Sequence, residues 1–259
     1  MTEWYIYLAV VGVGVFAGYI NTLAGSGSLL TLPLLMFLGL PPNVANGTNR
    51  VAILLQNVIG VASFTRQKKL DFKLDIWLAI PAIFGAILGA VIAVDINVMI
   101  MKQVIGALLL IMFFVILFKP EVWVKEQAGT IHSKPGPLKV IIFFAIGLYG
   151  GFIQAGVGFF LLTGLVMGAG LDLVRANAVK VFIVLCYTPV ALFIFYMNDQ
   201  VDFFWGLILA LGNMTGAFLA TKMAVRKGSS FVRYVLLLII FLASVHLLGF
   251  TGILLKLTN

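Results

Sequence analysis

The stretch NTLAGSGSLLTLPLL, from Asn21 to Leu35, interrupts a very apolar chain with two glycines, two serines and two threonines. A similar stretch, IQAGVGFFLLTGLV, runs from Ile153 to Val166. Irregular backbone at membrane depth is tolerated only where it is buried in protein or lines a cavity. We therefore interpret the two stretches as a pair of helix breaks that help to build a binding site.

The composition places the whole chain in a membrane. It is 62% hydrophobic and only 10% charged, with a mean hydropathy of +1.15, whereas a soluble domain carries roughly 25% charged residues. The net charge of +8 does not indicate nucleic-acid binding, because the lysines and arginines are confined mostly to short loops, as topology signals are. The single cysteine, Cys186, excludes an intrachain disulfide. We read the N-terminus as the first membrane segment rather than as a cleaved signal peptide.

The hydrophobic pattern predicts an all-α polytopic membrane protein with ten apolar segments. Two of them, the second and the seventh, are too short to span a bilayer, which takes about 20 helical residues. The expected segments are Trp4–Ile20, Ser28–Leu38, Val44–Phe64, Leu74–Val94, Val98–Phe118, Leu138–Gln154, Gly158–Ala169, Leu173–Met197, Phe203–Val225 and Phe231–Leu255.

Loop charges predict the orientation. Loops rich in lysine and arginine are expected on the cytoplasmic side, and the loops without them outside. The basic loops are 66–73, the central linker 119–137 and 222–228, and the others lie at Asp95 and at 198–202. All five agree if both termini are external in the inner membrane, either with ten segments or with eight spans plus two re-entrant hairpins.

The chain also contains an internal repeat. A shift of 131 residues places Ala24 on Ala155 and brings the Gly-x-Gly pairs into register, and further on it aligns Asn46 with Asn177. Residues 1–118 would form the first repeat and residues 138–259 the second, joined by the linker. Because each half has an odd number of segments, the second half should enter the membrane from the opposite side, as in inverted-repeat transporters. The alternative is a duplication retained only for packing.

The breaks offer groups that suit an anion. A helix N-terminus exposes backbone N–H groups and carries partial positive charge. The candidate donors are Gly25, Ser26, Gly27 and Ser28 in the first break, with Gly156 and Gly158 in the second.

Cations and amides follow each break. Arg50 and Lys180 fall one position apart in the aligned repeat, and intramembrane cations are usually functional. We expect them to bind the substrate together with Asn46, Asn49 and Asn177. The alternative for Arg50, Lys180 and the more peripheral Arg175 is that they only reach toward an interface.

These motifs resemble a known family. The glycine-rich AGSGSLLTLPLL followed by NVANGTNRVA, with both echoed in the second half, is similar to the TauE/SafE family of membrane permeases, and the resemblance covers essentially the whole chain. It implies transport, often export, of sulfur-containing anions such as sulfite, sulfoacetate and other organosulfonates. Members commonly show a third glycine where this chain has Ser26 or Ser28, so substrate preference could differ.

The sequence therefore predicts a secondary transporter, an exporter of a small sulfur-containing anion by alternating access, with an anion channel of the same fold as the alternative. We expect no catalytic residues, metal site or cofactor, because no P-loop or metal-ligand spacing is present. A membrane enzyme acting on a lipid or quinone was the third possibility, and no general base stands out for it. The expected partners are a small anion and the lipid bilayer, without nucleic acid. Glycine-rich packing faces also permit a homodimer.

Overall fold

A computed structural model describes residues 4–105, 107 and 136–247, and all regular structure in these ranges is helical. The helices are α1 (Trp4–Ala24), α2 (Ser28–Phe37), α3 (Pro42–Arg66), α4 (Phe72–Val94), α6 (Pro137–Phe152), α7 (Val157–Thr163), the π-helical turn η2 (Gly164–Gly168), α8 (Leu173–Met197) and α9 (Phe203–Leu247).

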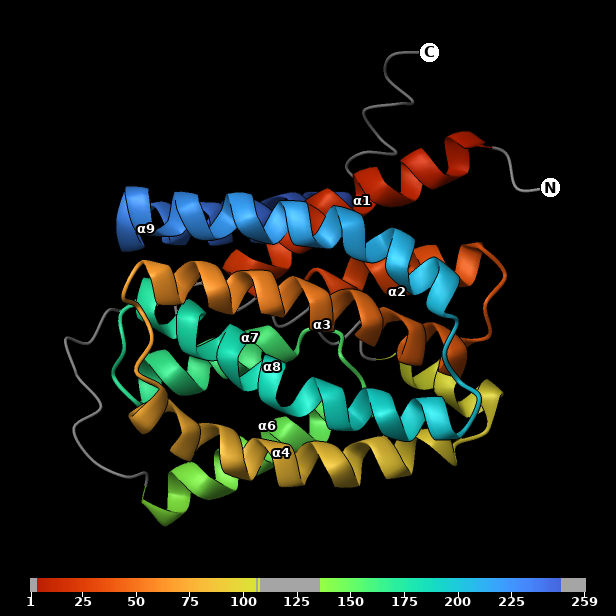
Figure 1. Cartoon of the computed structure of the whole chain (residues 1–259), viewed down its shortest axis with the longest axis horizontal. Coiled ribbons are helices and arrows are strands. Elements are labelled where there is room, and N and C mark those ends of the chain that lie inside the picture. Colours follow the sequence, from red (N-terminus) through yellow and green to blue (C-terminus); the bar gives the residue numbers. More distant parts are fainter. Residues whose placement is uncertain (1–3, 106, 108–135, 248–259) are drawn as a thin grey trace.

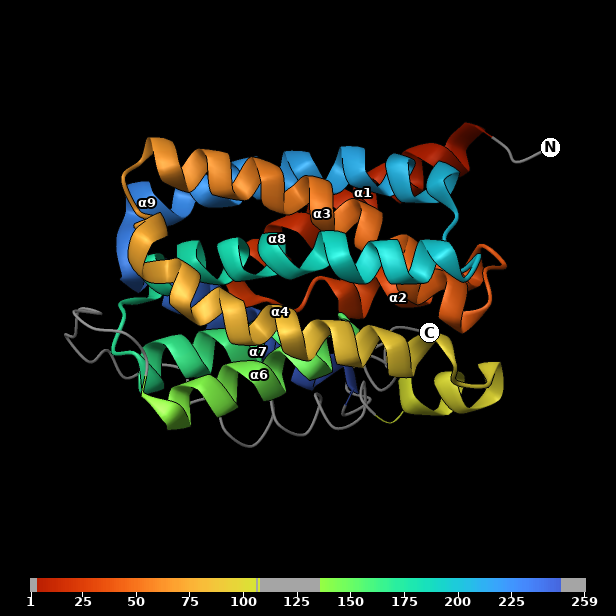
Figure 2. The same cartoon turned by 60° about the horizontal axis from the view of Figure 1, so that its bottom comes forward.

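The long helices lie side by side along one axis, with α1 and α9 on one side, α3 and α8 in the middle, and α4 and α6 on the other side (Figure 1). In the second view α3 lies level with α1 and α9, with α8 below them and α4 and α6 below α8 (Figure 2). Within the described residues, four helices are long and apolar enough to cross a membrane: α1, α4, α8 and the part of α9 up to Lys227. The chain is therefore a multi-pass, all-helical membrane protein, as predicted.

Glycines allow the outer helices to approach their neighbours closely. A Cβ on Gly18 of α1 would collide with the backbone of Asn213 in α9, and a Cβ on Gly147 of α6 would collide with that of Ala82 in α4. Such small residues let membrane helices pack backbone against backbone. The result is that the first helix of each half packs on a helix of the other half.

The structure repeats with the spacing found in the sequence. Helix α3 and helix α8 have the same length, and both of their ends are offset by 131 residues. The starts of α4 and α9 have the same offset. The described residues with positive φ also form pairs at this spacing: Gly25 with Gly156, Gly39 with Gly170, and Lys68 with Asp199. The colours in Figure 1 show that α3 and α8 run in opposite directions.

Three expected segments differ from the structure or lie partly outside it. We expected two segments at Phe203–Val225 and Phe231–Leu255, whereas the structure assigns one helical element, α9, to Phe203–Leu247. Figure 1 shows the α9 ribbon turning back at one end of the bundle. Most of Val98–Phe118, the linker up to residue 135 and the end of the last segment lie outside the described residues.

Candidate functional site

The two helix breaks meet in the interior of the bundle. Gly25 and Gly156 hold the same left-handed conformation, with φ of 77° and 73°. A Cβ on Gly25 would overlap the backbone of Gly158, and a Cβ on Gly158 would overlap the backbone of Gly25. The breaks therefore cross with their main chains in contact, a geometry that only glycine permits at these two positions.

Arg50 lies next to this crossing and holds the end of α6. Its side chain is fully buried. Nη1 donates to the carbonyl oxygen of Gly150 at 3.1 Å and Nη2 to that of Gly151 at 2.6 Å, while the guanidinium stands 4.6 Å from the centre of the Phe195 ring. The last carbonyls of a helix lack intrahelical partners and carry partial negative charge. Arg50, from the first half, thus caps the first helix of the second half.

Lys180 makes the reciprocal contact. Its Nζ donates to the carbonyl oxygens of Asn21 at 2.9 Å and Thr22 at 2.8 Å, both in the last turn of α1. The third bond goes to Asn177 Oδ1 at 2.7 Å. All three ammonium donors are therefore used. Lys180, from the second half, caps the first helix of the first half.

Asn46 adds to the cap on α6, because its Nδ2 donates to the carbonyl oxygen of Phe152 at 2.8 Å. Of the predicted residues, Asn46 and Arg50 thus lie together at the end of α6, and Asn177 and Lys180 lie together at the end of α1. The two helix ends that they cap, Ala24 of α1 and Phe152 of α6, lie within a few residues of Gly25 and Gly156 along the chain. The predicted site residues consequently form one buried region around the crossing.

A hydrogen-bonded network attaches α2 to α3 at the first break. Thr31 donates to Asn49 Oδ1 at 2.6 Å, and Asn49 Nδ2 donates to Ser28 Oγ at 3.1 Å. Ser26, Ser28, Thr31 and Asn49 are all buried. Sequence reasoning missed Thr31, although its position one turn after Ser28 would place both hydroxyls on one face of α2.

Tyr187 and Gln154 form a second polar group, near the end of α6. Gln154 Nε2 donates to the Tyr187 hydroxyl at 3.1 Å, and a Cβ on Gly150 would lie 2.8 Å from the same hydroxyl oxygen. Tyr149 completes the group by donating to the carbonyl oxygen of Ala155 at 2.7 Å. The Tyr149 bond supports the second break through its main chain, and the Tyr187 bond supports it through the Gln154 side chain.

Several buried polar atoms in the site have no hydrogen-bond partner. Among the described residues these are the donors Arg50 Nε and Asn177 Nδ2, the Thr22 hydroxyl and the acceptor Asn46 Oδ1. Buried polar groups normally have partners, so an orphaned donor is informative. Both donors belong to residues that cap the broken helices, and both are of the kind that binds an oxyanion.

Arg175 has a different environment from the two central cations. It forms an ion pair of 2.7 Å with the buried Asp75 and also donates to the carbonyl oxygen of Lys69. It therefore joins α8 to the start of α4, at the end of the bundle that carries the basic 66–73 loop. This position agrees with the more peripheral place that the sequence suggested for Arg175.

Comparison with known proteins identifies the family. The sequence profile described as "Sulfite exporter TauE/SafE" matches residues 10–247. The chain belongs to the TauE/SafE family. A "Probable membrane transporter protein" of Haemophilus influenzae is 27% identical over 89% of each chain. A "Probable membrane transporter protein ORF9" of a Sinorhizobium species is 28% identical over 93% of this chain and 92% of the relative. No solved structure gives a significant match.

This TauE/SafE protein is thus a membrane transporter rather than an enzyme, as its family and relatives are named. Within the part of the chain that the structure describes, no group of three or more histidine, cysteine or acidic side chains could hold a metal ion.

Proposed function

We propose that this TauE/SafE protein is a secondary carrier that exports a small sulfur-containing oxyanion, such as sulfite or an organosulfonate, across the inner membrane. The observation that supports it most is the pair of buried cations, Arg50 and Lys180, which contact backbone carbonyls instead of carboxylates. A helix C-terminus supplies roughly half a negative charge. Roughly half a positive charge per cation is therefore left without compensation in a low-dielectric interior, which favours an entering anion.

The anion would bind beside the glycine crossing. The first break offers the hydroxyls of Ser26 and Ser28, with Asn49 behind them. Arg50 Nε and Asn177 Nδ2 supply further donors that are not yet used. A compact tetrahedral or pyramidal oxyanion accepts several such bonds at once, and bonds to an ionised acceptor are about twice as strong as neutral ones.

Alternating access would follow from an inverted repeat of two five-segment halves. The opposite directions of α3 and α8 and the common 131-residue offset support this arrangement. Each cation links its own half to the first helix of the other half. An anion that attracts Arg50 or Lys180 away from the carbonyls would loosen these links and permit one half to rock against the other. The orientation that the loop charges predict would place both termini outside.

The test is flux of labelled sulfite and sulfonates into proteoliposomes. We expect saturable flux with counterflow, abolished by Arg50→Ala and by Lys180→Ala in protein that remains folded. Arg226→Gln, which removes an exposed cation on α9, is the matched control and should transport normally.

Each other result has a definite meaning. Flux that survives both alanine substitutions would show that the cations do not serve the anion. Flux without saturation or counterflow would identify an anion channel instead of a carrier. If no sulfur-containing anion moves, the substrate class is wrong for this chain.

A further inference from the structure

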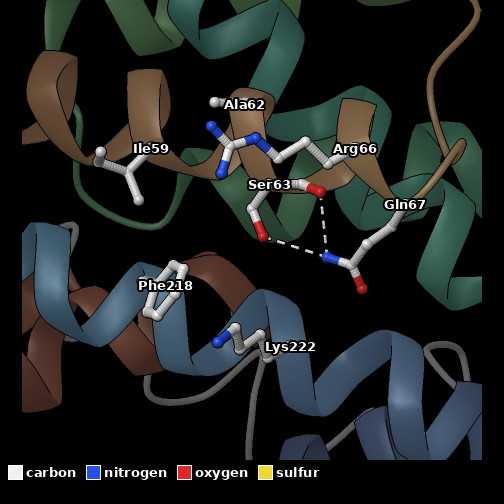
Figure 3. Close-up of a pocket in the computed structure, with 7 residues that line it drawn as sticks. All are labelled: Ile59, Ala62, Ser63, Arg66, Gln67, Phe218 and Lys222. Atoms are coloured by element: carbon white, nitrogen blue, oxygen red, sulfur yellow. Dashed lines mark hydrogen bonds between the residues drawn. The ribbon is translucent and has the colours of Figure 1, made fainter.

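A separate pocket lies between α3 and α9, away from the glycine crossing (Figure 3). Its volume is about 470 Å³, within the range of small-molecule sites. Helix α3 is from the first half and α9 from the second. The lining residues are Ile59, Ala62, Ser63, Arg66, Gln67, Phe218 and Lys222.

One part of the pocket is cationic. Arg66 and Lys222 are both exposed, and among the described residues neither forms an ion pair. Lys222 Nζ stands 4.2 Å from the centre of the Phe218 ring, and Gln67 Nε2 donates to Ser63 Oγ at 3.1 Å. The pocket therefore presents two positive charges, one from each wall, without a carboxylate between them.

The other part is apolar and faces outward. Figure 3 shows Ile59 and Phe218 to one side of Ser63, with Gln67 on the opposite side. Phe218 is 41% exposed, and Val58, next to Ile59 in α3, is 45% exposed. In a membrane protein such exposed apolar side chains contact lipid. The pocket thus has a cationic part and an adjacent apolar part, which together extend over about two turns of α3.

We propose that this pocket binds an anionic phospholipid, with the phosphate between Arg66 and Lys222 and an acyl chain along Ile59, Ala62 and Phe218. A soluble anion would need the cations but not the apolar wall, so the combination favours a lipid. Basic pockets between membrane helices are suited to anionic headgroups. The position of the pocket also suits an anionic lipid, because the basic 66–73 loop lies at the same end of the bundle.

The bound lipid would join the two halves at this end. Beneath the pocket, Ser63 and Thr221 share a hydrogen bond of 2.6 Å between their hydroxyls, which already connects α3 to α9. A phosphate held by one cation from each helix would strengthen that link. Because α3 also carries Arg50, the lipid would bias the position of the helix that caps α6.

Native mass spectrometry of the detergent-purified full chain tests the proposal. The protein is titrated with phosphatidylglycerol and with phosphatidylcholine of the same acyl chains. We expect at least one phosphatidylglycerol to bind more tightly than phosphatidylcholine. Each cation that contacts the headgroup of an anionic lipid contributes about fivefold to affinity, so Arg66→Gln with Lys222→Gln should weaken phosphatidylglycerol binding about 25-fold. The binding of phosphatidylcholine should not change.

Lys73→Gln is the matched control, because it removes an exposed cation at the same end but outside the pocket. It should leave lipid affinity unchanged. Equal affinities for the two lipids in the wild type, or equal losses in the control and the pocket variants, would overturn the proposal. Competition by inorganic phosphate or glycerol 3-phosphate at the lipid's own affinity would show a site for a free anion instead. If the double variant does not fold, the single variants and the wild-type lipid comparison decide.

Discussion

At the first break the chain reads Ala-Gly-Ser-Gly-Ser and ends at Ser28, whereas the second break reads Ala-Gly-Val-Gly-Phe and ends at Phe159. Both use a left-handed glycine at the same place, and their main chains touch at Gly25 and Gly158. The side chains differ, since Ser28 bonds to Asn49 while Phe159 packs in the hydrophobic core.

The comparison separates backbone geometry from side-chain chemistry. Gly25 of the first break and Gly158 of the second meet at the crossing, so each half contributes one glycine to this contact. The serines serve hydrogen bonding, and the second half replaces them with packing. The polar groups that could contact an anion directly through hydroxyls are thus concentrated in the first half, whereas the capping cations come from both.

The largest effect is expected from Gly158→Ala. Its methyl group would overlap the backbone around Gly25, and a backbone cannot yield as a flexible side chain can, so we expect a loss of about 3 kcal/mol or more in the free energy of unfolding. Thermal unfolding in detergent measures it. Gly168→Ala is the control, because no atom lies within 4 Å of the added carbon. Equal unfolding midpoints for the two variants would show that the breaks do not touch.

The next effect tests whether both halves depend equally on their caps. Lys180→Met leaves the Thr22 carbonyl and Asn177 Oδ1 without a donor, while the Asn21 carbonyl keeps the Gly25 N–H, and Arg50→Met leaves the carbonyls of Gly150 and Gly151. A buried polar group left unsatisfied costs about 1–3 kcal/mol. Both variants should therefore unfold at clearly lower denaturant concentrations than wild type and lose transport. A loss confined to one of them would contradict the reciprocal capping.

A smaller effect should distinguish the two breaks by function. Ser26→Ala with Ser28→Ala removes two hydroxyls from the first break, and we expect the KM for the transported anion to rise about tenfold, as for one or two lost charge-assisted bonds. Val157→Ala makes the matching change in the second break and should lower stability by about 1 kcal/mol with an unchanged KM. Flux measurements over a range of anion concentrations check both, and the opposite pattern would move the site to the second break.

The smallest effect comes from a glycine that is needed only for its conformation. Gly39 has a φ of 94° with open space around it, so Gly39→Ala should cost about 1–2 kcal/mol, the strain of a left-handed alanine. Chemical denaturation gives this value, and transport should persist. A cost as large as that of Gly158→Ala would mean that Gly39 has a role beyond its backbone conformation.

Local patterns predicted most of the secondary structure. Length and hydropathy identified the long helices, and the 131-residue shift anticipated the matching bounds of α3 and α8, because each depends on nearby residues. The single helical assignment through the polar run after Val225 was not predicted, because that run, RKGSS, has the composition of a loop. The two intramembrane cations could also be identified from the sequence, because a charged residue inside an apolar segment is rare and usually functional.

The sequence by itself determined that this is a helical membrane protein with two related halves, two glycine breaks and two intramembrane cations. Only the tertiary structure decided what those groups touch. Arg50 reaches the end of α6 and Lys180 the end of α1, across 100 and 158 residues, and no periodicity encodes such distant partners. The physical reason is that the last carbonyls of a helix need hydrogen-bond donors from outside the helix. In this fold the donors for α1 and α6 come from the opposite half of the chain.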